Sequence, residues 1–356
     1  MKKYDFAFIV HSRDRTDLPR KYPILRYVPN IVFDWITLNL FPIIVSNISG
    51  AKDIISGKEI SGIIVGIPMT ATQLLENRDL ALKKIIAAVN LAKIKGAKHI
   101  GLGAMTASLS KGGKDVIEAI DDVHITTGRT YTAKNITDYI LRTINMCKLD
   151  IGTTKVAIVG AAGGIGSGVA ISLAKKGIKN FVLIDLERKL QHLTKKIEYL
   201  ENNASDLRIQ VGHQLSLIND CKIVVAATNS PEIVIRSSDI SSGSVIINDA
   251  QPSDIDPEII KHRKDVLVIE GGVLHTKSIN CHFNMGLQHK NDIFSCLAEV
   301  ILLSSTRSAG HYSIDDFDEN LYNHLSSVGD KLGFELCMQN YRDVISDFRM
   351  SDFINK

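Results

Sequence analysis

One cysteine lies in a stretch that could support nucleophilic chemistry. Cys296 belongs to NDIFSCLAEVILL (residues 291–303), an apolar run with helix-like spacing. A thiolate is a strong nucleophile and a competent leaving group, so it could take up an acyl group from a thioester. A cysteine among apolar neighbours also fills cores as a small hydrophobe, and periodicity alone favours that role. Asn291 and Asp292 predict a helix start one turn earlier, which would leave the sulfur only modest help from the helix dipole.

The other four cysteines are weaker candidates. Cys147 lies on a predicted helix and Cys221 begins a predicted strand, so both are expected to be structural, as is Cys337 on a C-terminal helix. Cys281 lies beside His282 in a predicted loop and is the main rival of Cys296. The odd count and the lack of C-x-x-C predict reduced thiols in a cytoplasmic protein.

A glycine-rich turn is the second feature with chemical meaning. VGAAGGIGSG (residues 159–168) follows an apolar strand and opens a helix. Glycines let the backbone approach a pyrophosphate, and the helix N-terminus supplies N–H donors. The turn predicts a dinucleotide site made up of Gly160, Ala162, Gly163, Gly164, Ile165, Gly166, Asp185, Arg188, Ala227, Thr228, Gly271 and Gly272.

The residues after the second strand of this half leave the cofactor open. Asp185 ends that strand, where an acid bonds the ribose hydroxyls and repels a 2′-phosphate, which favours NADH. Arg188 and Lys189 follow closely and could hold a 2′-phosphate, or be solvated charges at a helix start. The choice between NAD and NADP stays open on residues alone.

The composition of the chain excludes some classes of function. The 356 residues include 45% hydrophobic and 23% charged residues, as in soluble globular proteins. A net charge of +3 is too weak to indicate nucleic-acid binding. Residues 31–45 are apolar but broken by Asp34, Asn39 and Pro42, so no transmembrane segment is expected; they either line an acyl tunnel or belong to the core. No spacing of His, Asp or Glu predicts a metal site.

Strands and helices alternate along most of the chain. Strands are predicted at residues 4–10 and 61–68, a helix at 70–97, a strand and loop at 98–106, and a long connecting helix within 124–152. From residue 155 the alternation predicts a parallel sheet, with helices after residue 272. The predicted fold class is α/β, with an N-terminal α/β substrate domain (1–150), a Rossmann-type doubly wound parallel sheet (151–275) and a C-terminal helical segment that carries Cys296 (276–356).

Several stretches resemble, in order, the long-chain acyl-[acyl-carrier-protein] reductases of cyanobacterial type. These stretches are GLGAMTAS (101–108), ITTGRTYTA (125–133), VAIVGAAGGIGS (156–167), IEGGVL (269–274) and FSCLAEVILL (294–303). The resemblance covers residues 4 to 340 approximately, and its Thr-Thr-Gly and Cys-x-Ala-Glu parts are the specific ones.

The resemblance implies an NAD(P)H-dependent reductase that converts an acyl thioester to an aldehyde. Cys296 would carry the acyl group, NADPH would supply hydride, and acyl carrier protein or acyl-CoA would be the substrate donor, with an aldehyde-consuming enzyme as a possible partner. The expected substrate or oxyanion residues are Gly103, Thr106, Thr126, Thr127, Gly128 and His275. An acidic carrier would need basic residues, and those on or just after one helix are Lys83, Lys84, Lys93, Lys95 and Lys98.

Two other functions fit the same layout. A shikimate-dehydrogenase-like oxidoreductase would move hydride at an alcohol with a Lys/Asp pair, although no clear N-terminal pair is evident in the sequence. A dinucleotide-binding module without catalysis is the third hypothesis. The threonines of residues 126–132 have a plainer role as helix caps, and His275 and His282 are candidate proton donors or ordinary histidines.

Overall fold

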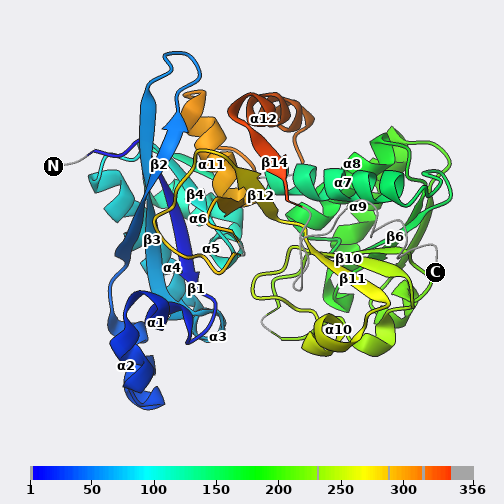
Figure 1. The fold of residues 1–356 in the computed structure, drawn as a ribbon, viewed down its shortest axis with the longest axis horizontal. Helices are drawn as coiled ribbons and strands as arrows, with labels where there is room; N and C mark the ends of the chain where they lie inside the picture. The colour runs from blue at the N-terminus through cyan, green and yellow to red at the C-terminus, as the bar shows by residue number, and fades with distance from the viewer. Residues whose placement is uncertain (1–2, 231, 288, 315–316, 338–356) are drawn as a thin grey trace. The chain divides into compact units, whose positions relative to one another are not determined.

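The computed structural model describes residues 3–230, 232–287, 289–314 and 317–337, whose contacts divide them into two compact units (Figure 1). The first unit holds the described residues up to Tyr131 and returns with Leu274–Glu335, whereas the second holds Thr132–Val273 and the end of the described chain. These limits differ from the predicted boundaries at 150 and 275. Helix α7 (Arg129–Met146) belongs to the second unit from Thr132 on, and the segment with Cys296 belongs to the first.

The first unit is built on a five-stranded sheet. Its order is β2 (Ile43–Lys52), β3 (Glu59–Thr70), β1 (Phe6–Ser12), β4 (His99–Leu102) and β5 (His124–Thr126). Only β2 runs antiparallel to its neighbour. Strands β1 and β3 are nearly continuous apolar runs because helices cover both faces of the sheet.

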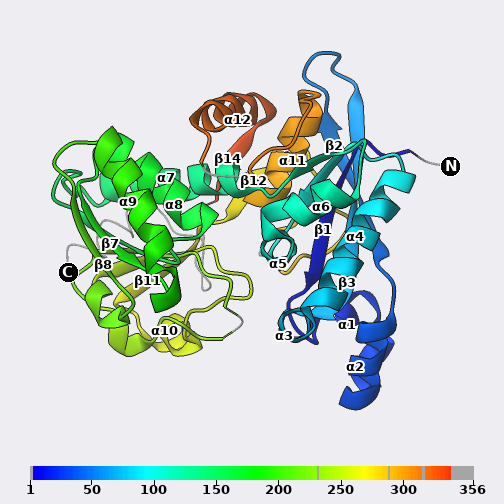
Figure 2. The same ribbon diagram turned by 180° about the vertical axis from the view of Figure 1, so that it is seen from behind.

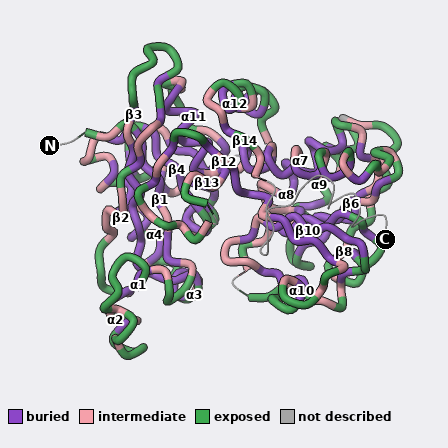
Figure 3. Tube along the Cα trace, in the orientation of Figure 1, coloured by how far each residue is buried: buried purple, intermediate pink, exposed green. Residues whose placement is uncertain are grey.

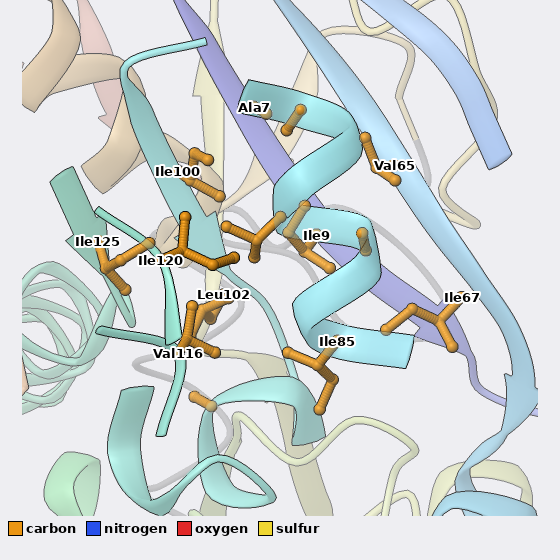
Figure 4. Close-up of a cluster of buried hydrophobic side chains, with 14 of the residues drawn as sticks. Ala7, Ile9, Val65, Ile67, Ile85, Ile100, Leu102, Val116, Ile120 and Ile125 are labelled. Atoms are coloured by element: carbon orange, nitrogen blue, oxygen red, sulfur yellow. The ribbon is translucent and has the colours of Figure 1, made fainter. Parts of the chain in front are cut away.

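Helices on the two faces bury the core of the first unit. Helix α4 (Arg78–Ile94) packs on β1 and β3 (Figure 2), and α11 (Ser295–Ser305) packs on β4 and β1. Ile9, Ile85 and Ile100 are fully buried between these layers (Figure 4). The remaining helices are α1 (Asp17–Lys21), α2 (Asn30–Asn39), α3 (Ala71–Glu76), α5 (Met105–Ser108), α6 (Lys114–Ala119) and α12 (Glu319–Leu332).

The second unit is a six-stranded, fully parallel sheet. Its order is β11 (Val266–Glu270), β10 (Ser244–Asn248), β9 (Ile223–Ala226), β6 (Lys155–Val159), β7 (Asn180–Ile184) and β8 (Arg208–Gly212). The chain runs outward from β6 to β8 and then returns to β9 beside β6, which is the doubly wound Rossmann order and confirms the predicted fold class. Its further helices are α8 (Gly164–Lys175), α9 (Leu190–Asn203) and α10 (Pro257–His262).

Two predictions of local structure were wrong. The helix predicted at 70–97 is two helices, because Asn77 between α3 and α4 takes a non-helical conformation (φ −126°, ψ 57°). Helices were expected after residue 272, but β12 (Val273–Thr276), β13 (Asp292–Phe294) and β14 (Phe334–Leu336) form a small sheet in the order β13-β12-β14. Predictions that concern residues 338–340 lie outside the described residues.

Residues 31–45 were expected to line an acyl tunnel or to belong to the core, but several of their large side chains are exposed. They form α2 and the start of β2, and Ile31, Trp35 and Phe41 are exposed. Lys84, expected on a basic surface, is buried and donates to the carbonyl oxygens of Thr37 and Leu40. None of the helices described is both long and apolar enough to span a membrane.

The central strand gives a direct test of the first core. Ile9→Ala removes a fully buried side chain and should lower the free energy of unfolding by about 2–5 kcal/mol. The matched control Ile55→Ala, at a side chain that is 74% exposed, should change it by less than about 0.5 kcal/mol. Urea unfolding followed by circular dichroism compares the two, and equal effects would contradict this core.

Candidate functional site: a dinucleotide turn and a cysteine at a helix start

The glycine-rich turn connects β6 to α8 at the carboxyl edge of the second sheet. Gly160 has φ +89°, and a Cβ there would lie 2.4 Å from the carbonyl oxygen of Ala227. A Cβ on Gly166 would lie 2.4 Å from the carbonyl oxygen of Gly160. Any side chain would force α8 and the turn apart, so these glycines keep the backbone where a pyrophosphate can meet the start of α8, which begins at Gly164.

Asp185 fixes the same turn. Its Oδ2 accepts a hydrogen bond from the Ala162 N–H (2.8 Å), and its Oδ1 accepts from the Leu186 N–H (2.8 Å). The carboxyl group is buried, and Lys189 Nζ lies 3.7 Å from Oδ1. Arg188 lies in the short 3-10 helix that precedes α9. Asp185 therefore fixes the shape of the glycine turn through these two hydrogen bonds.

The other predicted cofactor residues follow neighbouring strands of the second sheet. Ala227 and Thr228 follow β9, and Gly271 and Gly272 follow β11, so they lie at the carboxyl edge that also carries the glycine turn. The groups present there fit a dinucleotide lying across the point where the strand order reverses.

Sequence reasoning missed a cluster of carboxyl groups at this edge. Thr228 Oγ1 donates to Asp254 Oδ2 (2.6 Å). Burial, together with the nearby carboxyls of Glu270 and Asp254, raises the pKa of Asp249 well above its ordinary value. A Cβ on Gly272 would lie 2.3 Å from Asp249 Oδ1. The acids in the run INDAQPSD (residues 247–254) were the available signal.

Cys296 lies at the start of a helix, not in its second turn as predicted. Helix α11 begins at Ser295, and Asn291 and Asp292 precede it in a loop and in β13. Cys296 is partly exposed and belongs to the first turn, where the positive end of the helix dipole favours a thiolate. A Cβ on Gly128 (φ +75°) would lie 2.3 Å from Cys296 Cβ. The structure therefore brings the Thr-Thr-Gly segment against the cysteine.

A buried glutamate joins these two segments. Glu299, one turn after Cys296, accepts hydrogen bonds from Thr126 Oγ1, from Ser313 Oγ (2.7 Å) and from the Tyr131 N–H (2.8 Å). Burial raises the pKa of Glu299, and these hydrogen bonds oppose the rise. Sequence reasoning gave Glu299 no role, although an acid in an apolar helix was a usable signal.

The threonine hydroxyls predicted to hold an oxyanion or cofactor are engaged within the protein. Thr126 donates to Glu299, and Thr127 donates to the carbonyl oxygen of Ser313. Thr106, fully buried, donates to the carbonyl oxygen of Gly103 (2.7 Å). Backbone N–H groups of the same segments are engaged as well, since Gly103 donates to the carbonyl oxygen of Ile9 and Gly128 donates to Thr126 Oγ1.

His275 is paired with a buried carboxylate. The Nδ1 atom of His275 lies 2.9 Å from Asp292 Oδ1, and the Asp292 side chain has no exposed surface while that of His275 is 37% exposed. The carboxylate favours the tautomer with hydrogen on Nδ1, so the lone pair of Nε2 is the one available for proton transfer. His282, the other predicted histidine, hydrogen-bonds to Ser49 through Nε2 (2.9 Å).

Three of the remaining cysteines are buried, unlike Cys296. Burial raises the pKa of Cys281 to about 12, and those of Cys147 and Cys221 to about 11. Cys281 is thus a poor rival, and Cys337 is the other partly exposed thiol. Among the described residues, no group of three His, Cys, Asp or Glu side chains is placed to hold a metal ion.

Comparison with known proteins supports a dehydrogenase. Residues 143–272 match the family model of shikimate / quinate 5-dehydrogenase, which is less than half of the chain. Aminotransferase PigE of Serratia sp. (strain ATCC 39006) is 25% identical over 266 residues, 73% of this chain and 30% of its own length. The long-chain acyl-[acyl-carrier-protein] reductase of Synechococcus elongatus is 25% identical over 239 residues, 63% of this chain and 66% of its own length. The chain thus spans less than two thirds of these relatives.

Among solved structures, the shikimate 5-dehydrogenase of Listeria monocytogenes in complex with shikimate and NAD shares 11% identity. The match covers 92% of this chain and 96% of that one, with a TM-score of 0.35.

These comparisons correct the resemblance drawn from sequence stretches. The family model that matches is that of the shikimate/quinate dehydrogenases, and the match to the acyl-carrier-protein reductase is weak, so assignment to that reductase family was wrong. The glycine turn carried no family information, because many dinucleotide-binding folds share it, and the other matching stretches are only a few residues long. The alternative, a shikimate-dehydrogenase-like oxidoreductase, is better supported. The match on residues 143–272 supports a dinucleotide-dependent dehydrogenase, and it agrees with the predicted NADH or NADPH cofactor.

The glycine turn can be tested without a known substrate. Gly166→Ala places a methyl group against the Gly160 carbonyl and should weaken NADH or NADPH binding by at least about tenfold. Gly152→Ala is the control, because its nearest neighbour would lie 3.5 Å away. Titration of cofactor fluorescence measures both variants, and unchanged affinity in Gly166→Ala would contradict the assigned turn.

Thiol labelling tests the placement of Cys296. Iodoacetamide at pH 7.5, with peptide mapping by mass spectrometry, should modify Cys296 well before Cys147, Cys221 and Cys281, because Cys296 is partly exposed whereas burial raises the pKa of the other three thiols. Cys337→Ser removes the other partly exposed thiol and should leave the fast phase intact. Fast labelling of Cys281 would contradict its burial.

Proposed function

We propose that this protein transfers hydride between a nicotinamide cofactor and the carbonyl or hydroxyl carbon of a small substrate, with His275 moving the proton. The observation that carries the proposal is the His275–Asp292 pair, a partly exposed imidazole held by a buried carboxylate. Such a pair is a common acid–base device, because the carboxylate fixes the tautomer and stabilises the imidazolium. The match to shikimate/quinate dehydrogenases supports the same class of reaction.

The proposed step balances one proton and one hydride. In the direction of alcohol oxidation, His275 Nε2 takes the hydroxyl proton while the C–H bond breaks and its electron pair leaves as hydride. The bound nicotinamide supplies the hydride acceptor in this direction and the donor in the other. In carbonyl reduction the imidazolium returns the proton to the forming alkoxide.

A histidine takes the role that a Lys/Asp pair was expected to have. Each lysine–aspartate pair described in the first unit has an exposed partner, as in Lys111–Asp115 and Lys93–Asp122. The buried Lys84 donates to backbone carbonyls instead. The His275–Asp292 pair is the better candidate for acid–base work.

Cys296 favours a second candidate, the reduction of an acyl thioester to an aldehyde. The thiolate would attack the thioester carbonyl and the carrier thiol would leave. Hydride from the bound cofactor would then reach the carbonyl carbon, and collapse of the alkoxide would expel Cys296 and release the aldehyde. Its place in the first turn of α11, against Gly128, is the observation in favour. Acyl carrier protein or acyl-CoA would be a substrate donor only under this candidate.

One set of assays separates the two candidates. Purified protein is given NAD⁺ or NADP⁺ with hydroxy acids, including shikimate and quinate, and NADH or NADPH with acyl thioesters of several chain lengths. Under the first candidate, His275→Asn should lower kcat with a hydroxy acid by about 10²-fold or more, and Cys296→Ala should change it only a few-fold. His262→Asn, at an exposed histidine, is the control.

The opposite pattern supports the second candidate. An acyl adduct on Cys296 without cofactor, aldehyde release with cofactor, and loss of both in Cys296→Ala would replace the first proposal. Turnover of neither substrate class by a protein that binds the dinucleotide would contradict both. Comparison of NADH with NADPH, in the native protein and in Arg188→Ala, decides which cofactor is preferred.

A further inference from the structure

Residues 22–41 expose an unusual concentration of large apolar side chains. Among the described residues sixteen such side chains are exposed, and half of them lie in this short stretch: Tyr22, Ile24, Tyr27, Ile31, Val32, Trp35, Leu40 and Phe41. Tyr27, Ile31 and Phe41 are at least 80% exposed. Single exposed apolar residues are normal, but a contiguous cluster marks an interaction surface. We call it the 22–41 surface; it comprises a 3-10 helix (Pro23–Tyr27), α2 and the residues around them.

The 22–41 surface is held in place from within. The inner side of α2 is buried at Phe33 and Thr37, and Thr37 Oγ1 donates to Gln73 Oε1 (3.0 Å). Gln73 Nε2 donates to Asp34 Oδ1 (3.1 Å), and Lys84 caps the end of the helix through the carbonyl oxygens of Thr37 and Leu40. Ile31 and Trp35, on the other side of the helix, are exposed. Figure 3 shows much of the tube around α1 and α2 in the green of exposed residues.

Cationic side chains accompany the apolar ones. Lys21 and Arg26 are exposed, and residues 18–33 contain no acidic residue. Arg20 is also exposed but forms an ion pair with Asp17 (3.3 Å), and Asp34 of α2 pairs with Arg15. Aromatic rings with a polar edge, such as Tyr22, Tyr27 and Trp35, favour the boundary between lipid headgroups and acyl chains. Apolar, aromatic and basic residues that are close together are the composition of surfaces that lie on anionic membranes.

We propose that the 22–41 surface docks the protein onto an anionic lipid bilayer. The apolar side chains would enter the headgroup boundary, while Lys21 and Arg26 meet lipid phosphates and carboxylates. A neutral protein groove would satisfy the apolar residues but not the basic ones, which is why charge complementarity favours the bilayer. The surface lies at the carboxyl edge of the first sheet, since α1 follows β1 and α3 follows β3, and Gly103 and Thr126 end β4 and β5 at that same edge. The loops that carry the predicted substrate residues thus share an edge with the docking surface.

Tryptophan fluorescence can report membrane binding. Trp35 is the only tryptophan and is 66% exposed, so its emission should shift to the blue when it leaves water. The full chain is titrated with vesicles of 70% phosphatidylcholine and 30% phosphatidylserine, and with vesicles of phosphatidylcholine alone, and binding is checked by flotation. We expect a blue shift and flotation with the anionic vesicles, and binding at least about tenfold weaker with neutral vesicles or in 0.5 M NaCl.

Variants connect the binding to this surface. Ile31→Ser with Phe41→Ser, and separately Lys21→Glu with Arg26→Glu, should each weaken binding at least about tenfold. Ile55→Ser changes an exposed isoleucine outside the surface and should have no effect. Unchanged cofactor affinity and thermal unfolding show that each variant is folded.

Three results would overturn the proposal. The first is the absence of both flotation and blue shift with anionic vesicles. The second is binding that the two double variants leave unchanged. The third is a blue shift that depends on protein concentration without vesicles, which would mean that a second copy of the chain covers the surface instead.

Discussion

The hydrogen bonds that surround the Glu299 carboxyl group are the constraint on which the first unit's candidate site depends. A carboxyl group without exposed surface is tolerated only when its oxygens have partners, because the desolvation cost is large. Here the partners come from Thr126, from the start of α7 at Tyr131 and from Ser313. These bonds fix α11 against the Thr-Thr-Gly segment, and a glycine is needed at position 128 because Cys296 then lies too close for a side chain. The position of the thiol follows from a buried acid one turn away.

The second unit depends instead on contacts between residues that are close in sequence or in adjacent strands. Its central strands β6, β9 and β10 are buried, its turn glycines are required by backbone approaches of 2.4 Å, and Asp185 accepts a hydrogen bond from the Ala162 N–H. Each of these features involves residues close in sequence or in adjacent strands. That is why the doubly wound sheet and the glycine turn could be predicted from the sequence.

The first unit was harder to predict because its site combines distant segments. The helix start was misplaced since α11 has Phe294 as its N-cap, with no capping side chain, whereas Asn291 and Asp292 imitate a cap. Asp292 instead faces His275, seventeen residues earlier, because β12 and β13 are neighbours in the small sheet. Nothing in the local pattern of either residue reveals that partner. The compact units differ from the predicted domain limits for the same reason: residues 274–335 return to the unit whose strands were formed far earlier in the chain.

Hydrophobicity also predicted the wrong environment for residues 31–45, and the error is informative. An apolar stretch of this length lowers its free energy when it is removed from water. The sequence alone does not say whether it is buried in the protein's own core or against a binding partner. In α2 only the side that carries Phe33 and Thr37 is buried. Hydrogen bonds from Thr37 to Gln73 and from Lys84 to Leu40 hold the helix in this orientation. The outward side therefore stays exposed when the chain folds by itself. A rigid apolar face that folding leaves in water, flanked by Lys21 and Arg26, is better explained by a surface outside the chain than by the chain's own core.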